Sequence, residues 1–483
     1  MSPSITIVGL GPGDPNLITR EAWQVLQEAD EIYLRTVHHP TVVGLPDRAQ
    51  IHSFDALYEA HATFEEVYAA IAQRVVELGA RPQGVILAVP GHPLVGETAT
   101  RRILNLAKER DLPVRIVAGI SFLEPTVAAL GVDPFDGLQI CDATILAQQH
   151  HPNLDPDVAA LVVQLYNRAL ASEVKMTMMS LYHDDHPLRL VRGAGTANVQ
   201  VDDLPLYALD RRDDLDHLTT VYIPPLNRAG SLASYQDVVA RLRAPGGCPW
   251  DREQTHQTLR THLIEESYEV LAALDADDPA LLQEELGDLL LQILLHAQIA
   301  NEGGDFKLID SVQVAIEKLV RRHPHVFGAA QADTPDEVLR SWEQIKRAER
   351  GEEAFRSMLA GINKALPALA QALEVQRRVA RVGFDWPGPE PVADKVREEL
   401  AELAEAEAPE ERVAEFGDLL FSLVNLARWH DIDAESALRE ANARFMRRFA
   451  DLERQAAEAG VALEEMSLEQ MDALWEEAKR NEG

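Results

Sequence analysis

An internal repeat in the C-terminal half constrains this chain more than any other feature of its sequence. The pattern Glu-Glu-x-x-Glu begins at Glu265 and returns at Glu398, and Glu-x-Gly-Asp-Leu-Leu begins at Glu285 and returns at Glu415, about 130 residues later in each case. A pair of basic residues and a Trp–Lys pair follow both copies in the same order. Four matched elements in one order indicate a tandem duplication, so this half is predicted to fold as two copies of one unit.

The rest of the chain divides where this helical pattern begins. Residues 231–483 read almost entirely as helices rich in Leu, Ala, Glu and Arg, with breaks at Pro- and Gly-rich segments. Before residue 226, β-branched runs such as ITIVGL (5–10) and GVILAVP (84–90) alternate with amphipathic segments, which is typical of an α/β layer fold. The predicted domains are an α/β domain over 1–228, a linker over 229–245, repeat 1 over 246–350, a connector over 351–362 and repeat 2 over 363–483.

Composition agrees with a multidomain protein of the cytoplasm. A length of 483 residues suggests about three domains, and the net charge of −34 disfavours binding to nucleic acid or to anionic membranes, because no basic patch is visible. Cys141 and Cys248 are too few for a disulfide framework. No apolar run reaches the roughly 18 residues that span a bilayer, and the start lacks the layout of a signal peptide. We therefore expect a cytoplasmic protein with no nucleic acid or membrane partner.

The repeated acidic residues have the spacing of a metal site. Glu266 and Glu269 are three apart and share one face of a helix, and Glu285 and Asp288 repeat this spacing on the next predicted helix. A helical hairpin can bring the four carboxylates together, where they repel one another unless a divalent cation neutralises them. Carboxylate oxygens without His or Cys favour Mg²⁺ or Mn²⁺ over zinc.

A solvated helix face is the competing interpretation of one such acidic pair. Two observations count against it. The apolar neighbours of the second acidic pair predict a buried helix, where uncompensated acids are costly; they are Leu286, Leu289, Leu290 and Ile293. The whole set also recurs in repeat 2, at Glu399, Glu402, Glu415 and Asp418. Metal binding is the interpretation that we prefer.

Basic and aromatic residues follow each acidic set. A metal held by acids usually serves phosphate chemistry, and Lys318 and Arg322, one helical turn apart, can offer cationic donors to a polyphosphate. Alone, such a pair is more often a solvated face or part of an ion pair. The spacing recurs at Arg444 and Arg448. Trp–Lys pairs with a shared helix face follow at Trp342 with Lys346 and at Trp475 with Lys479. Core packing or an interface is the commoner use of such a Trp, and stacking on a base is the alternative.

Residues 240–483 resemble the MazG family of nucleoside triphosphate pyrophosphohydrolases, which is all-α. The motifs that carry the resemblance are CPWD (248–251), EESYE (265–269), ELGD (285–288), RRHPHVF (321–327), WEQIK (342–346), VGFDW (382–386), EELAE (398–402) and EFGD (415–418). The resemblance implies Mg²⁺-dependent hydrolysis of an NTP or dNTP between the α- and β-phosphates, giving the monophosphate and pyrophosphate. It also implies a homo-oligomer, expected to be a dimer.

The same resemblance assigns roles to individual positions. The implied metal ligands are Glu266, Glu269, Glu285 and Asp288 in repeat 1 and Glu399, Glu402, Glu415 and Asp418 in repeat 2. The implied phosphate contacts are Lys318, Arg322, Lys346, Arg444, Arg448 and Lys479, with Trp342 and Trp475 near the nucleotide. Arg444 stands where the family often has Lys. Glu265 and Glu398 are candidates for orienting or deprotonating the attacking water. Because both acidic sets are intact, both repeats are expected to be active.

A glycine-rich turn follows the first predicted strand. Gly9-Leu10-Gly11-Pro12-Gly13-Asp14 allows close approach of the backbone to a ligand. It is not a dinucleotide fingerprint, because Asp14 stands where the third glycine of GxGxxG belongs, and it lacks the GK[ST] of a P-loop. By itself, the turn is equally consistent with a tight loop that binds nothing.

Further motifs make residues 4–228 resemble the tetrapyrrole (corrin/porphyrin) methylase family. They are GPGDPNLIT (11–19), EADEIYLRT (28–36), PGHP (90–93) and AGIS (118–121). The family fold is a two-lobed α/β methyltransferase with S-adenosylmethionine between its lobes. The positions that fall near the implied cofactor site are Gly11, Pro12, Gly13, Pro90, Gly91, Ser121 and Tyr166. Two departures are His92, where the family commonly has Asp, and LRTVHHP (34–40), where an Asp-rich segment is usual.

The sequence therefore predicts a cytoplasmic, multidomain protein with a methylase-like α/β domain before a duplicated all-α MazG-type region. Its main predicted function is Mg²⁺-dependent NTP pyrophosphohydrolysis. Two alternatives stay open: an S-adenosylmethionine-dependent methyltransferase of tetrapyrrole type whose helical half is a scaffold, and a methylase-like sensor domain that regulates the pyrophosphohydrolase.

Overall fold

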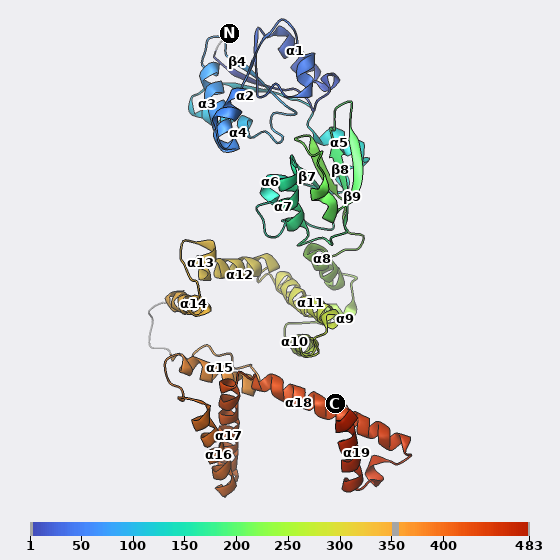
Figure 1. The fold of residues 1–483 in the computed structure, drawn as a ribbon, viewed down its shortest axis with the longest axis vertical. Coiled ribbons are helices and arrows are strands. Elements are labelled where there is room, and N and C mark those ends of the chain that lie inside the picture. The colour runs from blue at the N-terminus through green and yellow to red at the C-terminus, as the bar shows by residue number, and fades with distance from the viewer. Residues whose placement is uncertain (1–2, 350–356, 482–483) are drawn as a thin grey trace. The chain divides into compact units, whose positions relative to one another are not determined.

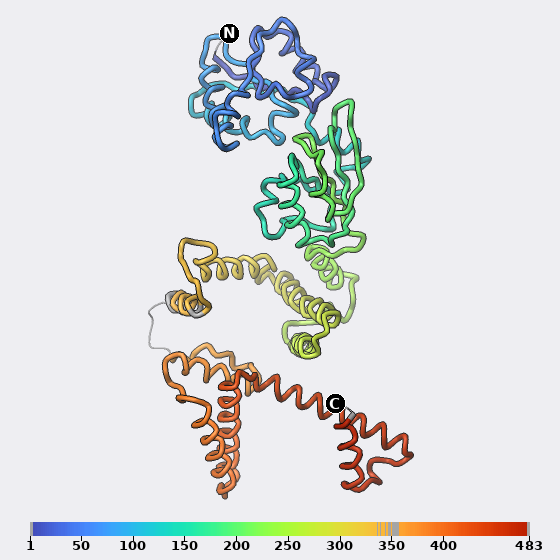
Figure 2. Tube along the Cα trace, in the orientation of Figure 1, coloured from blue at the N-terminus to red at the C-terminus, as the bar shows by residue number. Residues whose placement is uncertain are grey.

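The structure, a computed structural model, describes residues 3–349 and 357–481, and within the last helices the side chains of 336, 339, 343, 346–348 and 481 lie outside the description. The chain forms two compact units, Met1–Glu253 and Gln254–Gly483. Figure 1 labels the elements, and the tube in Figure 2 follows the chain through them. Residues 351–356 of the predicted connector, and the last residue or residues of each predicted repeat, lie outside the described residues.

The first lobe of unit 1 is a five-stranded parallel sheet in the order β3-β2-β4-β1-β5. Its strands are β1 (Ile5–Gly9), β2 (Glu31–Leu34), β3 (Gln50–Ser53), β4 (Val85–Val89) and β5 (Val114–Val117). Its helices are α1 (Arg20–Glu28), α2 (Asp55–Ala60), α3 (Phe64–Gly79) and α4 (Thr98–Glu109). Successive strand residues point to opposite faces, so Ile5 and Ile7 join the core under α3 and α4, whereas Val8 joins the core under α1.

The second lobe of unit 1 is a five-stranded mixed sheet in the order β6-β7-β10-β8-β9. Its strands are β6 (Leu138–Asp142), β7 (Ala159–Val163), β8 (Pro187–Arg192), β9 (Gln200–Pro205) and β10 (Thr219–Ile223). Its helices are α5 (Leu123–Leu130), α6 (Ala143–Leu146) and α7 (Arg168–Met178). Strand β10 is buried along its whole length, because it lies in the middle of the sheet.

Most of the predicted linker is a helix that belongs to unit 1. Helix α8 (Leu232–Arg243) is followed by α9 (Pro249–Glu253), which lies in the CPWD motif. Asp157 of the second lobe accepts hydrogen bonds from Gly230 N (2.9 Å), Ser231 N (3.0 Å) and Ser234 Oγ (2.5 Å) at the start of α8. Although burial opposes its charge, these hydrogen bonds lower the pKa of Asp157 to about 2. The ionised carboxylate of Asp157 therefore fixes the start of α8 to the second lobe.

Unit 2 is helical. Its first half contains α10 (Arg260–Asp275), α11 (Pro279–Gly303), α12 (Leu308–Arg322), α13 (Pro324–Phe327) and α14 (Pro335–Glu349). Its second half contains α15 (Ala368–Ala380), α16 (Pro389–Glu405), α17 (Pro409–Trp429), α18 (Ala434–Glu458) and α19 (Leu468–Asn481). The hairpins α10/α11 and α16/α17 occupy corresponding places in the two repeats. Helix α11 begins at Pro279, because Asp278 caps Ala280 N (3.0 Å) and Pro279 occupies the first turn.

The apolar faces of unit 2 are incompletely covered. The four clusters of buried apolar residues in the described part of the chain all lie in unit 1. Leu286 is 50% exposed and Ile293 47% exposed, and Leu289 and Leu290 are only half-buried. Within the described residues, the prediction that these residues bury α11 is therefore wrong, because about half of the surface of Leu286 and of Ile293 stays uncovered.

Candidate functional sites

Three carboxylates of repeat 1 meet between α10 and α11. Ligand oxygens of Glu266, Glu285 and Asp288 all lie within 4.8 Å of one another, and we call this group acid cluster 1. Burial, and then the charges of Asp288 and Glu269, raise the pKa of Glu266. Burial and Glu269 also raise the pKa of Glu285. Glu269 is exposed and borders the cluster. The helical spacing therefore does bring acids together, and their charges repel one another.

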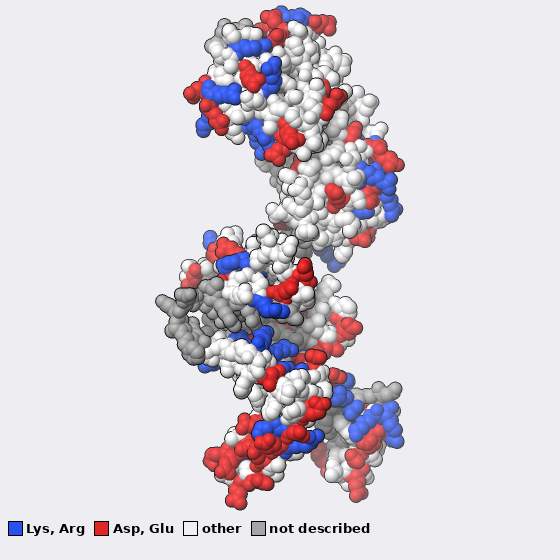
Figure 3. Space-filling view, turned by 60° about the vertical axis from the view of Figure 1, so that its left-hand side comes forward, with Lys and Arg blue, Asp and Glu red and all other residues white. Residues whose placement is uncertain are grey.

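Repeat 2 holds a matching group. Ligand oxygens of Glu399, Glu415 and Asp418 lie within 4.8 Å of one another between α16 and α17, and we call this group acid cluster 2. Glu399 is only 5% exposed. Burial, followed by the charges of Glu402 and Glu399, raises the pKa of Glu415, and Glu402 is an exposed border residue. Figure 3 shows acidic side chains gathered over this hairpin on the face in view.

The residues beside the two clusters differ, and sequence analysis missed them. In repeat 1, Gln292 is buried and donates its side-chain N–H to Glu266 at 3.4 Å. In repeat 2, Lys395 Nζ lies 2.8 Å from both Glu398 and Glu399. Hydrogen bonds to these two acids raise the pKa of Lys395. The signal was available in the spacing, because Gln292 lies one turn after Asp288 and Lys395 one turn before Glu399.

The candidate water-orienting acids face side chains of their own helices. Glu265 is exposed and its carboxylate lies 3.1 Å from His262 Nδ1, and Glu398 is exposed and binds Lys395. His262 and Lys395 occupy the same position relative to the Glu-Glu-x-x-Glu pattern. The ammonium group of Lys395 therefore lies beside acid cluster 2, at the position that the imidazole of His262 occupies in repeat 1.

The donor set of each cluster fits a hard divalent cation. Each offers three carboxylate oxygens at a spacing that one ion can bridge, with no sulfur and no imidazole in the group. In acid cluster 1, Glu266 accepts a hydrogen bond from the neutral amide of Gln292. Burial and the charges of neighbouring acids raise the pKa of Glu266, and a bound cation would offset both effects.

The predicted phosphate-binding residues lie on other helices. Lys318 and Arg322 are on α12, which packs on α11, α13 and α14, and among the described residues it makes at most marginal contact with α10. Arg444 and Arg448 are on α18, which leaves the α16/α17 hairpin in Figure 1 and packs mainly on α15 and α19. In the described part of the chain, these basic residues therefore lie on helices other than those that form the acid clusters.

The basic residues have protein partners of their own. Arg322 binds Glu349 and stacks on Trp342, with the guanidinium carbon 5.6 Å from the ring centroid. Arg444 lies 3.5 Å from Glu440, and Lys479 lies 2.5 Å from Glu476. Trp475 packs on Phe445, with ring centroids 4.9 Å apart. The side chain of Lys346 lies outside the described residues.

Glycine loops of unit 1 meet at the carboxyl ends of the parallel strands. Gly11 and Gly91 exchange backbone hydrogen bonds of 3.2 and 2.8 Å. A Cβ at Gly9 would lie 2.5 Å from Gly91 O and 2.6 Å from Gly119 N, so the loops after β1, β4 and β5 can touch only without side chains there. Gly91 has φ 64°, and a Cβ there would meet nothing within 4 Å. A ligand can therefore approach the backbone at Gly91, as ligands do at this edge of α/β sheets.

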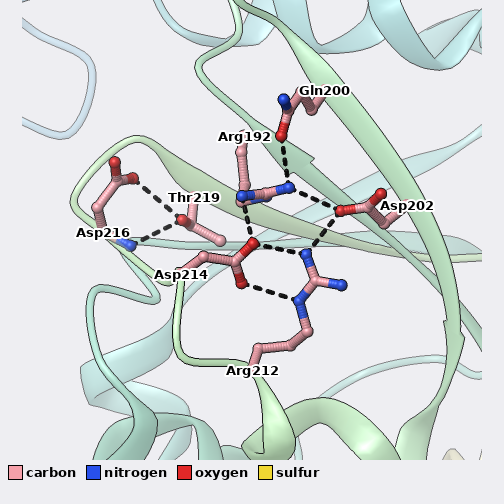
Figure 4. Close-up of polar contacts among 7 residues, drawn as sticks. All are labelled: Arg192, Gln200, Asp202, Arg212, Asp214, Asp216 and Thr219. Atoms are coloured by element: carbon pink, nitrogen blue, oxygen red, sulfur yellow. Dashed lines mark hydrogen bonds and ion pairs between the residues drawn. The ribbon is translucent and has the colours of Figure 1, made fainter.

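The same loop contacts the second lobe. Asp14 N donates to Gly195 O at 2.7 Å, and a Cβ at Gly195 would lie 2.4 Å from the Pro12 ring. Gly195 lies in the turn between β8 and β9, and Figure 4 shows the ion network that fixes this hairpin. Asp202 receives hydrogen bonds from Arg192 (2.9 Å) and Arg212 (2.7 Å). The network therefore holds the surface against which the glycine loop rests.

The remaining predicted cofactor residues have mixed surroundings. Ser121 is buried and donates its hydroxyl to Glu124 at 2.5 Å, so it serves the start of α5. Pro90 and Gly13 flank the glycine contact, and Tyr166 packs on the core of the second lobe. His92 accepts the Leu94 N–H at 3.1 Å through Nδ1, the turn-forming bond that an Asp oxygen makes elsewhere. The imidazole therefore replaces the expected carboxylate as a turn former.

In the LRTVHHP segment, Arg35 forms an ion pair with a buried acid. Arg35 Nη1 lies 2.5 Å from Glu97 Oε2, and the Glu97 side chain is 2% exposed.

No helix in the described part of the chain is long and apolar enough to cross a bilayer.

Comparison with known proteins accounts for the whole chain. The model for tetrapyrrole (corrin/porphyrin) methylases matches residues 4–210, the model for the MazG nucleotide pyrophosphohydrolase domain matches residues 254–327, and the model for phosphoribosyl-ATP pyrophosphohydrolase matches residues 384–445. Both resemblances identified from the motifs are thus confirmed. Repeat 2, predicted as MazG-like, matches the phosphoribosyl-ATP pyrophosphohydrolase model.

Individual relatives agree. The uncharacterized protein YabN of Bacillus subtilis is 42% identical over 496 residues, covering 100% of this chain and 99% of YabN. The nucleoside triphosphate pyrophosphohydrolase/pyrophosphatase MazG of Thermotoga maritima is 48% identical over 242 residues, covering 50% of this chain and 93% of that protein. Uroporphyrin-III-C-methyltransferase from Thermus thermophilus aligns with a TM-score of 0.37 at 19% identity, covering 46% of this chain and 93% of that chain. The chain therefore belongs to the same family as YabN over its whole length, and combines a tetrapyrrole methylase domain with a MazG nucleotide pyrophosphohydrolase domain.

Proposed function

We propose that this chain is a nucleoside triphosphate pyrophosphohydrolase that releases pyrophosphate from NTPs or dNTPs with Mg²⁺ or Mn²⁺. The observation that carries the proposal is the pair of acid clusters, each built from two helices, in which burial and then the charges of neighbouring acids raise the pKa of Glu266 and of Glu415. The 48% identity to a MazG pyrophosphohydrolase supports the same conclusion.

In this mechanism the residues of the chain hold the divalent ion and orient the attacking water. The proposed metal ligands are Glu266, Glu269, Glu285 and Asp288 in repeat 1, and Glu399, Glu402, Glu415 and Asp418 in repeat 2. A bound divalent ion supplies Lewis acidity to the phosphoryl oxygens and lowers the pKa of water. Gln292 fixes one oxygen of Glu266 and leaves the other for the ion. Glu265 and Glu398, exposed on the same helices, orient the attacking water and accept its proton.

We propose that a second copy of the chain completes each site. Two observations support this: within the described residues the basic residues lie on helices other than the two that form each acid cluster, and apolar side chains are exposed along the same hairpin. A dimer in which α12 and α14 of one copy lie over the α10/α11 hairpin of the other would cover Leu286 and Ile293 and deliver Lys318 and Arg322 to the triphosphate. Such a protein works in the cytoplasm, where its substrates are.

The glycine loops of unit 1 favour a second activity or a sensor. We propose that S-adenosylmethionine binds beside Gly11 and Gly91, because the backbone there is open and the loop is fixed against the second lobe. Two assays distinguish methyl transfer from regulation of hydrolysis. The first measures transfer of a labelled methyl group, and the second measures the change in NTP hydrolysis when S-adenosylmethionine is added.

The primary test is a panel of NTPs and dNTPs with Mg²⁺, in which pyrophosphate and orthophosphate are measured separately. The Glu266→Gln, Glu399→Gln double variant should lose pyrophosphate release and keep its helical content. The matched control is Glu317→Gln with Glu453→Gln, two exposed glutamates on α12 and α18. Full activity in the cluster variant would refute the site assignment.

A further inference from the structure

A carboxylate outside both acid clusters binds two arginines of repeat 1, Arg321 and Arg322. Glu349 is the last residue of α14. Its Oε1 accepts hydrogen bonds from Nε of Arg321 (2.8 Å) and Nε of Arg322 (3.2 Å), and its Oε2 accepts one from Nη2 of Arg322 (2.6 Å). These hydrogen bonds lower the pKa of Glu349 to about 2, the bond from Arg322 contributing most.

The contact fixes the guanidinium group of Arg322 on two sides. Its Nε–Nη2 edge faces Glu349, and its flat face lies over the Trp342 ring at 5.6 Å. The Arg322 side chain is 17% exposed. A guanidinium has five N–H donors in a rigid fork. Glu349 takes two of them, and within the described residues no other group accepts a hydrogen bond from Arg322.

Three donors of Arg322 are therefore left, and two of them lie on the Nη1–Nη2 edge. Lys318 lies one turn earlier on the same face of α12, is exposed, and has no ion pair among the described residues. An oriented guanidinium edge beside a free ammonium group is the arrangement that suits a polyphosphate. Without Glu349 and Trp342, Arg322 would have to give up its rotamer freedom when the phosphate binds.

We propose that Glu349 is a positioning residue for polyphosphate binding in repeat 1 and acts by aligning Arg322. The proposal rests on the proposed function, in which Arg322 contacts the triphosphate. The opposite role, a carboxylate that competes with phosphate for Arg322, predicts an effect of opposite sign. The geometry points to alignment, because Glu349 takes one edge of the fork and leaves the other.

The test uses the full chain with Glu399→Gln and Glu415→Gln, so that hydrolysis reports on repeat 1. Glu349→Gln should raise the KM for the best NTP about five- to twentyfold and change kcat less than twofold, because an aligned Arg322 binds ground state and transition state alike. Glu317→Gln, an exposed glutamate on α12, is the matched control and should change neither. A KM that stays constant or falls would overturn the proposal.

A second measurement does not need turnover. Binding of Mg²⁺–pyrophosphate to the same proteins, followed by calorimetry, should weaken about fivefold in Glu349→Gln. Arg321→Gln, which removes only the outer partner of Glu349, should weaken it two- to threefold. Equal binding in all three proteins would count against alignment, provided that circular dichroism shows unchanged helix content.

A double-mutant cycle separates alignment from general support of α14. Arg322→Lys removes the fork but keeps the charge. If Glu349 acts through Arg322, Glu349→Gln should change KM less than twofold in the Arg322→Lys background. An undiminished effect there would show that Glu349 acts by another route. These outcomes are distinct from failure of the proposed function, which would appear as a wild-type chain that releases no pyrophosphate.

Discussion

Acid cluster 1 predicts that one substitution should stabilise the hairpin without metal and destabilise it with metal. Glu266→Gln keeps the shape of the side chain and its contact with Gln292 but removes a charge that lies within 4.8 Å of Asp288 and Glu285. Without metal, the substitution should stabilise the α10/α11 hairpin, because it removes repulsion. With Mg²⁺, it should destabilise the hairpin relative to wild type, because an anionic ligand is lost.

The size of the effect follows from the separation of the charges. Two like charges 4.8 Å apart repel by about 1 kcal/mol in water and about 3 kcal/mol at an effective dielectric constant near 20. Glu266 is half-buried, so we expect a gain of about 1–2 kcal/mol in the absence of metal. Saturating Mg²⁺ at about one hundred times its Kd should stabilise the wild-type hairpin by about 2.7 kcal/mol, and the variant by less.

Hydrogen exchange measures this hairpin separately from the other domains. Amide protection of 260–303 should be higher in Glu266→Gln than in wild type with EDTA, and lower with Mg²⁺. Glu317→Gln should follow wild type in both conditions. Lower protection of Glu266→Gln in EDTA, by the same amount as in Mg²⁺, would refute the claim that the carboxylates repel one another and await a cation.

Three further outcomes follow from other contacts. Asp157→Asn should destabilise unit 1 by at most about 2 kcal/mol at pH 7 in urea unfolding, because the pKa of Asp157 is lowered from 3.8 to about 2. This stability is present above pH 3.8 and is lost as pH falls toward 2, so the difference from wild type should halve by about pH 3. The control Asp47→Asn, at an exposed position, should have no effect. Lys395→Gln leaves the buried Glu399 without its ion pair, so the rise in Tm between EDTA and Mg²⁺ should be larger than in wild type. Gly9→Ala drives a Cβ against Gly91 O and should lower the free energy of unfolding by about 2–3 kcal/mol. Gly131→Ala, where φ is 68° but space is open, should lower it by about 1 kcal/mol. Only Gly9→Ala should weaken the binding of S-adenosylmethionine, measured by calorimetry.

Local patterns predicted local structure well. The apolar runs at 5–10 and 84–90 correspond to β1 and β4. Of the four carboxylates that the spacing predicted to converge in each hairpin, three lie within 4.8 Å of one another between its two helices. This works because helix and strand periodicity alone decide which residues of one element share a face. The edge strands of the second lobe, β6 and β9, were not predicted, because they are half-exposed along most of their length and so lack a clear alternation.

What the sequence could not predict depends on contacts between distant elements. Spacing along α12 says that Lys318 and Arg322 share a face, but not that Glu349, 27 residues later, holds one of them. The leucines of α11 likewise form an apolar stripe, but periodicity does not say whether the covering surface belongs to the same chain. Lys395 and Gln292 were within reach of the spacing rule, yet nothing in a single sequence distinguishes them from other polar residues on a helix.

The two incomplete features of the helical half have one physical origin. A hairpin that carries converging carboxylates on one side and an apolar stripe on another cannot satisfy both alone, because charge needs a counter-ion and apolar surface needs cover. In unit 1 every sheet has its own buried core within the chain. Under the proposed function, the cation, the second copy and the polyphosphate would each supply something that the hairpins of unit 2 lack. Binding of any one of them should therefore favour binding of the others, since each removes a cost that the next would otherwise meet.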